Sequence, residues 1–220
     1  MEKLVIFGAG QIAEVARFYF EHDAGRRVAA FSVDAAYAKE PSFGGLPVVP
    51  FEELAQRFPP ASHGIFVAMS YQKINATRAE KLAAAEALGY RAATYVSSKA
   101  TVWPGFAPGP NCFILEDNTI QPFARVGRNV TLWSGNHVGH HATIGDHVFV
   151  ASHAVISGAV EIGDYSFIGV NATIRDNVRI GRSCVIGAGA LILEDAPDRS
   201  VYMGEASKAS RVPSDRLRGI

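Results

Sequence analysis

Residues 144–192 read IGDHVFVASHAVISGAVEIGDYSFIGVNATIRDNVRIGRSCVIGAGALI, and an aliphatic residue returns at every sixth position. The spacing extends back to Ile114, and the full series is Ile114, Ile120, Val126, Leu132, Val138, Ile144, Val150, Ile156, Ile162, Ile168, Ile174, Ile180, Ile186 and Ile192. A small or apolar residue often stands two positions earlier, on the same face of a strand. A six-residue period is not helical and indicates a parallel β-helix, in which each coil covers the next. We expect residues 111–192 to form it.

The composition describes an ordinary globular protein. Of the 220 residues, 48% are hydrophobic and 19% are charged, as in soluble domains. The 21 cationic and 21 anionic side chains cancel, so nothing favours nucleic acid or an anionic membrane as a partner. No apolar run approaches the ~20 residues of a membrane span, and no signal-peptide cleavage site is evident. We expect a cytoplasmic protein whose Cys112 and Cys184 are reduced core residues.

The amino-terminal residues predict a strand, a glycine turn, a helix and a second strand. KLVIF at 3–7 precedes Gly8-Ala9-Gly10, apolar residues then recur at helical spacing, and a second apolar run at 28–33 ends at Asp34. This is a βαβ unit whose turn fits G-x-G-x-x-A. The glycines serve either to let backbone amides approach a phosphate or to pack a tight turn. Asp34 either accepts a ribose hydroxyl or simply ends the strand.

Further strands at 64–69 and 92–96, with helices at 51–58 and 74–88, complete a small α/β unit. We therefore expect two domains: a Rossmann-like α/β domain at residues 1–97, and a β-helix domain with a carboxyl-terminal tail at 98–220. Residues 103–110, WPGFAPGP, predict a rigid joint or an irregular first coil.

The repeats IGDHVFV, IGDYSFI, IGRSCVI and IGAGALI resemble the hexapeptide-repeat acyltransferases. The α/β domain before them narrows the resemblance to the sialic acid O-acetyltransferase and nucleotide-amino-sugar N-acetyltransferase group. The resemblance implies a left-handed, three-sided β-helix, a homotrimer, and acetyl-CoA bound between subunits. It also implies a sugar nucleotide at the first domain, at Gly8, Gly10, Gln11 and Asp34. The group usually has G-x-G-G-H at this turn, from which Gly8-Ala9-Gly10-Gln11-Ile12 departs.

Five of the seven histidines lie between His137 and His153, and histidine suits proton transfer near neutral pH as well as metal binding. His141, His147 and His153 share one phase of the six-residue period. They therefore fall at three successive corners of a coil, where one chain cannot easily bring them to a single ion. We expect no metal and favour a general base.

The resemblance identifies that base. Residues 138–145, VGHHATIG, match the group's motif with His140 in the catalytic place and His141 where a carboxylate is common. The alternative for His140 is a surface histidine. The resemblance further implies acetyl-CoA contacts at His153, Gly158, Asn171, Ala188 and Lys208, although Lys208 can equally be a solvated lysine.

The function expected first is acetyl-CoA-dependent acetylation of a sugar, in particular a nucleotide-linked amino sugar of bacterial surface polysaccharide synthesis. A sugar O-acetyltransferase acting on a free or polymeric sugar is the first alternative. The second alternative is a non-catalytic or zinc-binding hexapeptide trimer.

Overall fold

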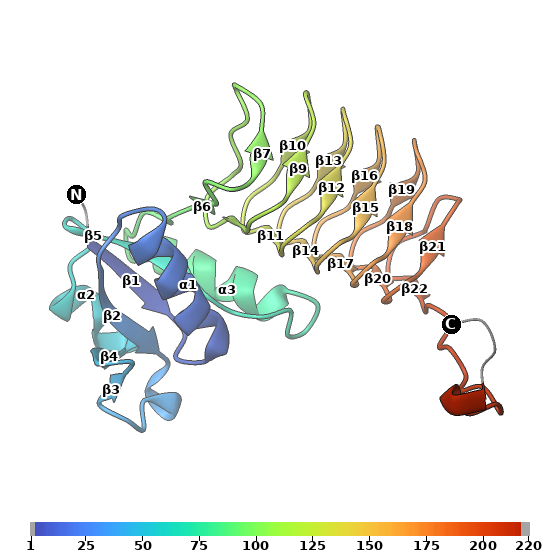
Figure 1. Cartoon of the computed structure of the whole chain (residues 1–220). Coiled ribbons are helices and arrows are strands. Elements are labelled where there is room, and N and C mark those ends of the chain that lie inside the picture. The colour runs from blue at the N-terminus through green and yellow to red at the C-terminus, as the bar shows by residue number, and fades with distance from the viewer. Residues whose placement is uncertain (1–2, 217–220) are drawn as a thin grey trace.

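A computed structural model describes residues 3–216 and places an α/β layer beside the first coils of a long β-helix (Figure 1). The α/β sheet has the strand order β3-β4-β2-β1-β5. Strands β1, β2, β4 and β5 run parallel, and only the short edge strand β3 is antiparallel. Their bounds are Lys3–Phe7 (β1), Val28–Val33 (β2), Ser42–Phe43 (β3), Leu46–Pro50 (β4) and His63–Val67 (β5).

Helices cover both faces of this sheet. Helix α1 (Gln11–His22) buries Ala13, Ala16 and Phe20 against one face, whereas α2 (Leu54–Arg57) and α3 (Ala76–Ala87) pack on the other. Short 3₁₀ helices occupy Ala35–Tyr37, Phe51–Glu53 and Ser214–Arg216. Among residues 3–216, no helix combines the length and the apolar character needed to cross a bilayer. The predicted βαβ unit is confirmed, because β1 and β2 pair in parallel and α1 connects them.

The β-helix has three sides, each a parallel sheet of two-residue strands. Side 1 contains β6 (Tyr95–Val96), β8 (Phe113–Ile114), β11 (Thr131–Leu132), β14 (Phe149–Val150), β17 (Phe167–Ile168), β20 (Val185–Ile186) and β22 (Val201–Tyr202). Side 2 contains β7 (Thr101–Val102), β9 (Thr119–Ile120), β12 (His137–Val138), β15 (Val155–Ile156), β18 (Thr173–Ile174) and β21 (Leu191–Ile192). Side 3 contains β10 (Arg125–Val126), β13 (Thr143–Ile144), β16 (Glu161–Ile162) and β19 (Arg179–Ile180).

The apolar positions of the six-residue series form the core of the β-helix, as predicted. Each is the second residue of a strand, and all of them are buried in one cluster. Cys112 and Cys184 are free thiols in that cluster, and burial raises the pKa of Cys112 to about 12. Strands from one coil to the next pair at a spacing of 18 residues, so Ile144 lies opposite Ile162.

A left-handed backbone turn makes every corner between these strands. The residue three positions before each apolar position has φ between 54° and 79°. Only two of these residues are glycine, Gly135 and Gly189. The others include His141, His147 and His153. Left-handed φ is uncommon outside glycine and favours asparagine, aspartate and histidine.

The two ends of the β-helix depart from the prediction. The expected strand at 92–96 divides between the two sheets. Ala92 forms a single parallel bridge with Ile65 of β5, whereas Tyr95–Val96 pairs with β8 of side 1. Val96 and Val102 continue the six-residue series backwards, so the β-helix begins earlier than predicted. Residues 103–110 are an irregular first coil, in which Gly109 donates to Val126 and Gly127 of side 3. The last coil is two residues shorter than the 18 of the others, because Val185 pairs with Val201. The domain boundary at residue 97 stays a prediction.

Buried polar side chains of α3 and of the turn before it fix the α/β layer to the β-helix. Arg78, 1% exposed, donates to Thr131 Oγ1 at 3.0 Å and to the carbonyl oxygens of His147 and Val148 at 3.1 and 3.3 Å. Burial lowers the pKa of Arg78 to about 10. Asn75 donates to the carbonyl oxygen of Tyr165 at 2.9 Å. These hydrogen bonds hold the α/β layer in a fixed orientation against the β-helix.

Candidate functional site

His140 and His141 lie at the corner where the chain passes from side 2 to side 3, between β12 and β13. Both are exposed, and their Nδ1 atoms are 3.2 Å apart. In a neutral pair, one Nδ1 must donate and the other must accept. If His140 donates, its Nε2 has a free lone pair and can remove a proton, while His141 holds the ring in that tautomer. The neighbour of a histidine base has this orienting role in catalytic triads.

The coil before this pair supports it from one side. The backbone N–H of His140 donates to Gln121 Oε1 at 2.8 Å. The Phe123 ring, 18 positions before His141, lies 4.8 Å from the His141 ring. We refer to His140 and His141 as the histidine corner.

The coil after the pair brings Gly158 under His140, as the 18-residue spacing requires. A Cβ atom at Gly158 would lie 2.7 Å from His140 Cε1 and 2.8 Å from Nε2, closer than real Cβ contacts. The Gly158 N–H donates to Asp176 Oδ1 at 2.7 Å, and its carbonyl oxygen accepts from Asn177 at 2.9 Å. The glycine therefore gives room to the His140 ring.

Three other residues predicted to contact acetyl-CoA lie at a different corner of the chain. His153, Asn171 and Ala188 stand where side 1 passes to side 2, and all three are exposed. Side 2 separates them from the histidine corner within one chain. Lys208 lies beyond β22 in the exposed tail that leaves the last coil (Figure 1). One chain thus places the predicted residues in two separate groups, His140, His141 and Gly158 at one corner and His153, Asn171 and Ala188 at another.

The amino-terminal turn shows why its first glycine is needed. Gly8 has φ 123°, and a Cβ there would lie 2.7 Å from the carbonyl oxygen of Ala68. Packing alone therefore requires this glycine. Gly10 and Gln11 are exposed at the start of α1. Gln11 lines a cavity of about 490 Å³ together with Trp133 of the β-helix. The carboxylate of Asp34 pairs with Lys81 of α3, whose ammonium group also lies over the rings of Phe7 and Phe51.

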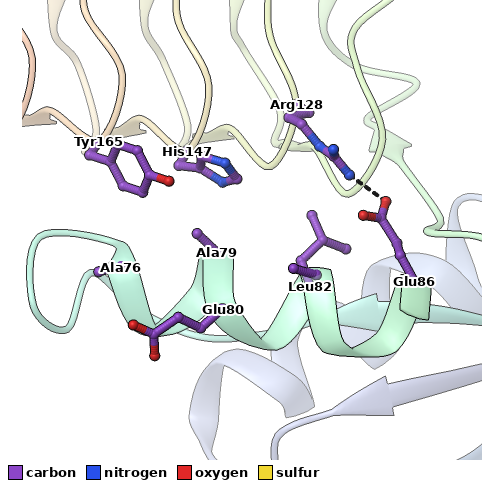
Figure 2. A pocket seen from close by; sticks show the side chains of 9 residues that line it. Ala76, Ala79, Glu80, Leu82, Glu86, Arg128, His147 and Tyr165 are labelled. Carbon is purple, nitrogen blue, oxygen red and sulfur yellow. Dashed lines mark hydrogen bonds and ion pairs between the residues drawn. The ribbon is translucent and has the colours of Figure 1, made fainter. Parts of the chain in front are cut away.

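His147 stands at the third corner, between sides 3 and 1, and faces α3 across a cavity of about 410 Å³ (Figure 2). Its ring stacks on Tyr165 at 4.7 Å, and its Nδ1 lies 2.9 Å from Asn129 Nδ2. Burial is the main cause that lowers the pKa of His147. The placement of His141, His147 and His153 at three different corners is as predicted. Within residues 3–216, no three His, Cys, Asp or Glu side chains are grouped so that they could hold a metal ion.

Known proteins share the repeats and the fold of this chain. The model of the family described as bacterial transferase hexapeptide (six repeats) matches residues 123–158 and 159–194. The acetyltransferase domain of PglB from Neisseria gonorrhoeae, solved in complex with acetyl coenzyme A, is 26% identical. Its match covers 92% of this chain and 96% of that domain, with a TM-score of 0.81. This chain carries the hexapeptide repeats and is an acyltransferase.

A second solved structure shares the fold of this acyltransferase. It is a mutant of perosamine N-acetyltransferase from Caulobacter crescentus in complex with CoA and GDP-perosamine. It is 23% identical over 93% of this chain and 94% of that one, with a TM-score of 0.84. A search of curated proteins gives no significant match. The fold is thus the expected α/β domain followed by a left-handed β-helix.

Sequence reasoning missed two groups of residues beside the histidine corner of this acyltransferase. Gln121 and Phe123 precede the histidines by about one coil, and Asp176 follows Gly158 by 18 residues. The signal was present, because any two residues 18 positions apart are neighbours in this fold.

Proposed function

We propose that this protein is an acetyl-CoA-dependent N-acetyltransferase of a nucleotide-linked amino sugar in bacterial surface polysaccharide synthesis, acting in the cytoplasm. The observation that carries the proposal is the histidine corner. Two exposed histidines share a 3.2 Å Nδ1 contact, and a glycine lies under the His140 ring. PglB was solved with acetyl coenzyme A, and the perosamine enzyme with CoA and GDP-perosamine.

The acetyl transfer that we propose needs only a base and a residue that positions it. The amine nitrogen attacks the thioester carbonyl carbon, and His140 Nε2 accepts the proton that the nitrogen loses. The carbon–sulfur bond breaks, and the CoA thiolate leaves. His141 acts as a positioning residue through the Nδ1 contact. A positioned base of this kind contributes roughly 10²–10⁴-fold.

We further propose a homotrimer, because one chain holds only part of the predicted site. In a closed ring, the histidine corner of one subunit meets the corner of its neighbour that holds His153, Asn171 and Ala188. Acetyl-CoA would lie in the groove between them, and Lys208 of the tail would reach its phosphates. Side 2 lies between these two corners and exposes Val155 and Leu191, 38% and 63%, as suits a buried subunit contact.

A second candidate is O-acetylation of a sugar without a nucleotide. The observation that favours it is the ion pair between Asp34 and Lys81. It engages the carboxylate expected to accept a ribose hydroxyl. In this case, the turn at Gly8, Gly10 and Gln11 would be structural only.

The test is an incubation of the purified protein with acetyl-CoA and a panel of acceptors. The panel contains GDP-perosamine, UDP-linked and dTDP-linked amino sugars, and the corresponding free sugars. Release of CoA thiol and the mass of the product are measured. Acetylation of a nucleotide-linked amine supports the first candidate, and acetylation of free sugar hydroxyls supports the second. No thiol release above the buffer rate with any acceptor would contradict both.

A further inference from the structure

A small cavity of about 200 Å³ adjoins the histidine corner on the side of the first coil. Its walls include Trp103 and Phe106 of the irregular first coil. They also include Gln121 and Phe123, which lie one coil before the two histidines and contact them. Apart from Gln121, its side chains are apolar. We call these four residues the aromatic cleft. The cleft is smaller than the roughly 300–1,000 Å³ of typical ligand pockets, so it suits a single ring.

Two contacts tie the aromatic cleft to the catalytic histidines. Phe123 lies 4.8 Å from the His141 ring, and Gln121 Oε1 accepts from the backbone N–H of His140 at 2.8 Å. Gly158 lies on the opposite side of His140. A group bound in the cleft therefore reaches the histidines from the side that faces away from Gly158.

The cleft is built in advance of binding. Phe106 N–H donates to the carbonyl oxygen of Trp103 at 3.1 Å, with Pro104 and Gly105 between them and φ 89° at Gly105. Proline second and a glycine with positive φ third form the pattern of a type II turn. Phe106 packs against the β-helix core, so this turn fixes the direction of Trp103.

Trp103 and Phe123 occupy positions that are energetically unfavourable for aromatic residues. Trp103 is 56% exposed and Phe123 is 73% exposed. Phe123 also has φ 68°, a region that bulky residues rarely adopt. Exposed aromatic surface beside a reaction centre is typical of a binding site.

We propose that the aromatic cleft is the acceptor subsite, which holds the C–H face of the acceptor's pyranose ring and sets specificity for rings with an apolar face. This inference rests on the proposed function, because it assigns the acceptor to the cleft and the thioester to the Gly158 side. The flat apolar walls contact ring carbons. The side-chain amide nitrogen of Gln121, which has no partner among the described residues, donates to a ring hydroxyl. The nucleophile then points toward His140.

The experiment compares three variants. Phe123→Asn removes the ring and keeps a residue that accepts the left-handed backbone, and Trp103→Ala removes the second wall. Phe18→Ala, at 57% exposure on the outer face of α1, is the matched control for loss of an exposed aromatic. Steady-state kinetics with GDP-perosamine and acetyl-CoA are combined with saturation-transfer NMR of methyl α-rhamnopyranoside, a 6-deoxy pyranoside. Light scattering reports the oligomeric state.

We expect both cleft variants to lose roughly tenfold or more in kcat/KM for the acceptor, with KM for acetyl-CoA within about twofold. They should also lose saturation transfer to the rhamnoside, whereas Phe18→Ala keeps both. Unchanged transfer in Phe123→Asn and Trp103→Ala would overturn the subsite. So would dissociation of the oligomer, since the aromatic residues would then be a subunit contact. If the wild type contacts the rhamnoside through the cleft but acetylates no acceptor, the proposed function fails, whereas the aromatic cleft remains a binding site for a pyranose ring.

Discussion

Replacement of Gly158 by alanine tests whether this glycine acts through His140. The new Cβ would lie 2.7 Å from His140 Cε1, whereas ordinary contacts begin near 3.4 Å, so the ring must move by about 0.7 Å. Beyond the glycine and its chain neighbours, the three atoms nearest to that Cβ all belong to the His140 ring. Gly158 does not have a left-handed φ. The variant should therefore fold normally while its base is displaced.

Misplacement of a reacting group by 1 Å costs about a hundredfold in rate. We thus expect Gly158→Ala to lose roughly 10- to 100-fold in kcat, about 1.4–2.7 kcal/mol of barrier. The assay is CoA thiol release at saturating acetyl-CoA and acceptor, with the melting temperature measured in parallel. The control is the same substitution in a His140→Ala background, where no ring remains to be displaced and no further loss is expected. Fully additive losses would refute the reasoning and point to a direct contact between Gly158 and acetyl-CoA.

Three further predictions concern the β-helix. Ile162→Asp or Ile168→Asp places an unpaired carboxylate in the buried core and should prevent folding; circular dichroism matching the wild type in either variant would contradict the core assignment. His147, whose pKa is lowered in the folded chain, binds fewer protons folded than unfolded. Stability should therefore fall as the pH drops below the unfolded pKa of about 6.5, and His147→Asn, which tolerates the left-handed corner, should reduce the loss of melting temperature between pH 7 and 5; an equal loss in both proteins would exclude His147 as the cause. Light scattering at micromolar concentration should give the mass of a trimer, and a stable monomer would remove the groove proposed for acetyl-CoA.

The repeats were predictable because one physical constraint acts at every coil. An inward side chain at each second strand residue must be apolar, so the period is visible in the sequence from Ile114 to Ile192. The same spacing includes Val96, which packs against the β-helix core, and Val102, which is 39% exposed. Both were missed because Pro108 interrupts the series. Residues at that interruption form no strand in the first coil of side 3.

Part of the site was also predictable by arithmetic on the period. Gly158 follows His140 by 18 residues, one coil, and so lies at the same corner. Ala188 follows His140 by 48 residues, which is not a multiple of 18, and so lies at another corner. The resemblance alone grouped them, whereas the period separates them within one chain.

The contact between the α/β layer and the β-helix was not predictable from the local sequence pattern. Arg78 lies in a helix rich in alanine and charge, where an arginine normally faces water. Its burial depends on the acceptors at Thr131, His147 and Val148, between 50 and 70 residues away in the chain. The ion pair of Asp34 with Lys81 likewise joins residues that are far apart in the chain. Such long-range polar contacts leave no periodic trace.

The most direct test of the account is the acetyl-transfer rate of His140→Ala, compared with that of His153→Ala at the other corner, where the proposed contact is with acetyl-CoA. His140→Ala should keep the fold and the binding of CoA, measured by calorimetry. It should lose at least about a hundredfold in thiol release, about 2.7 kcal/mol of barrier. Near-full activity in His140→Ala, or its abolition in His153→Ala alone, would show that the base lies elsewhere.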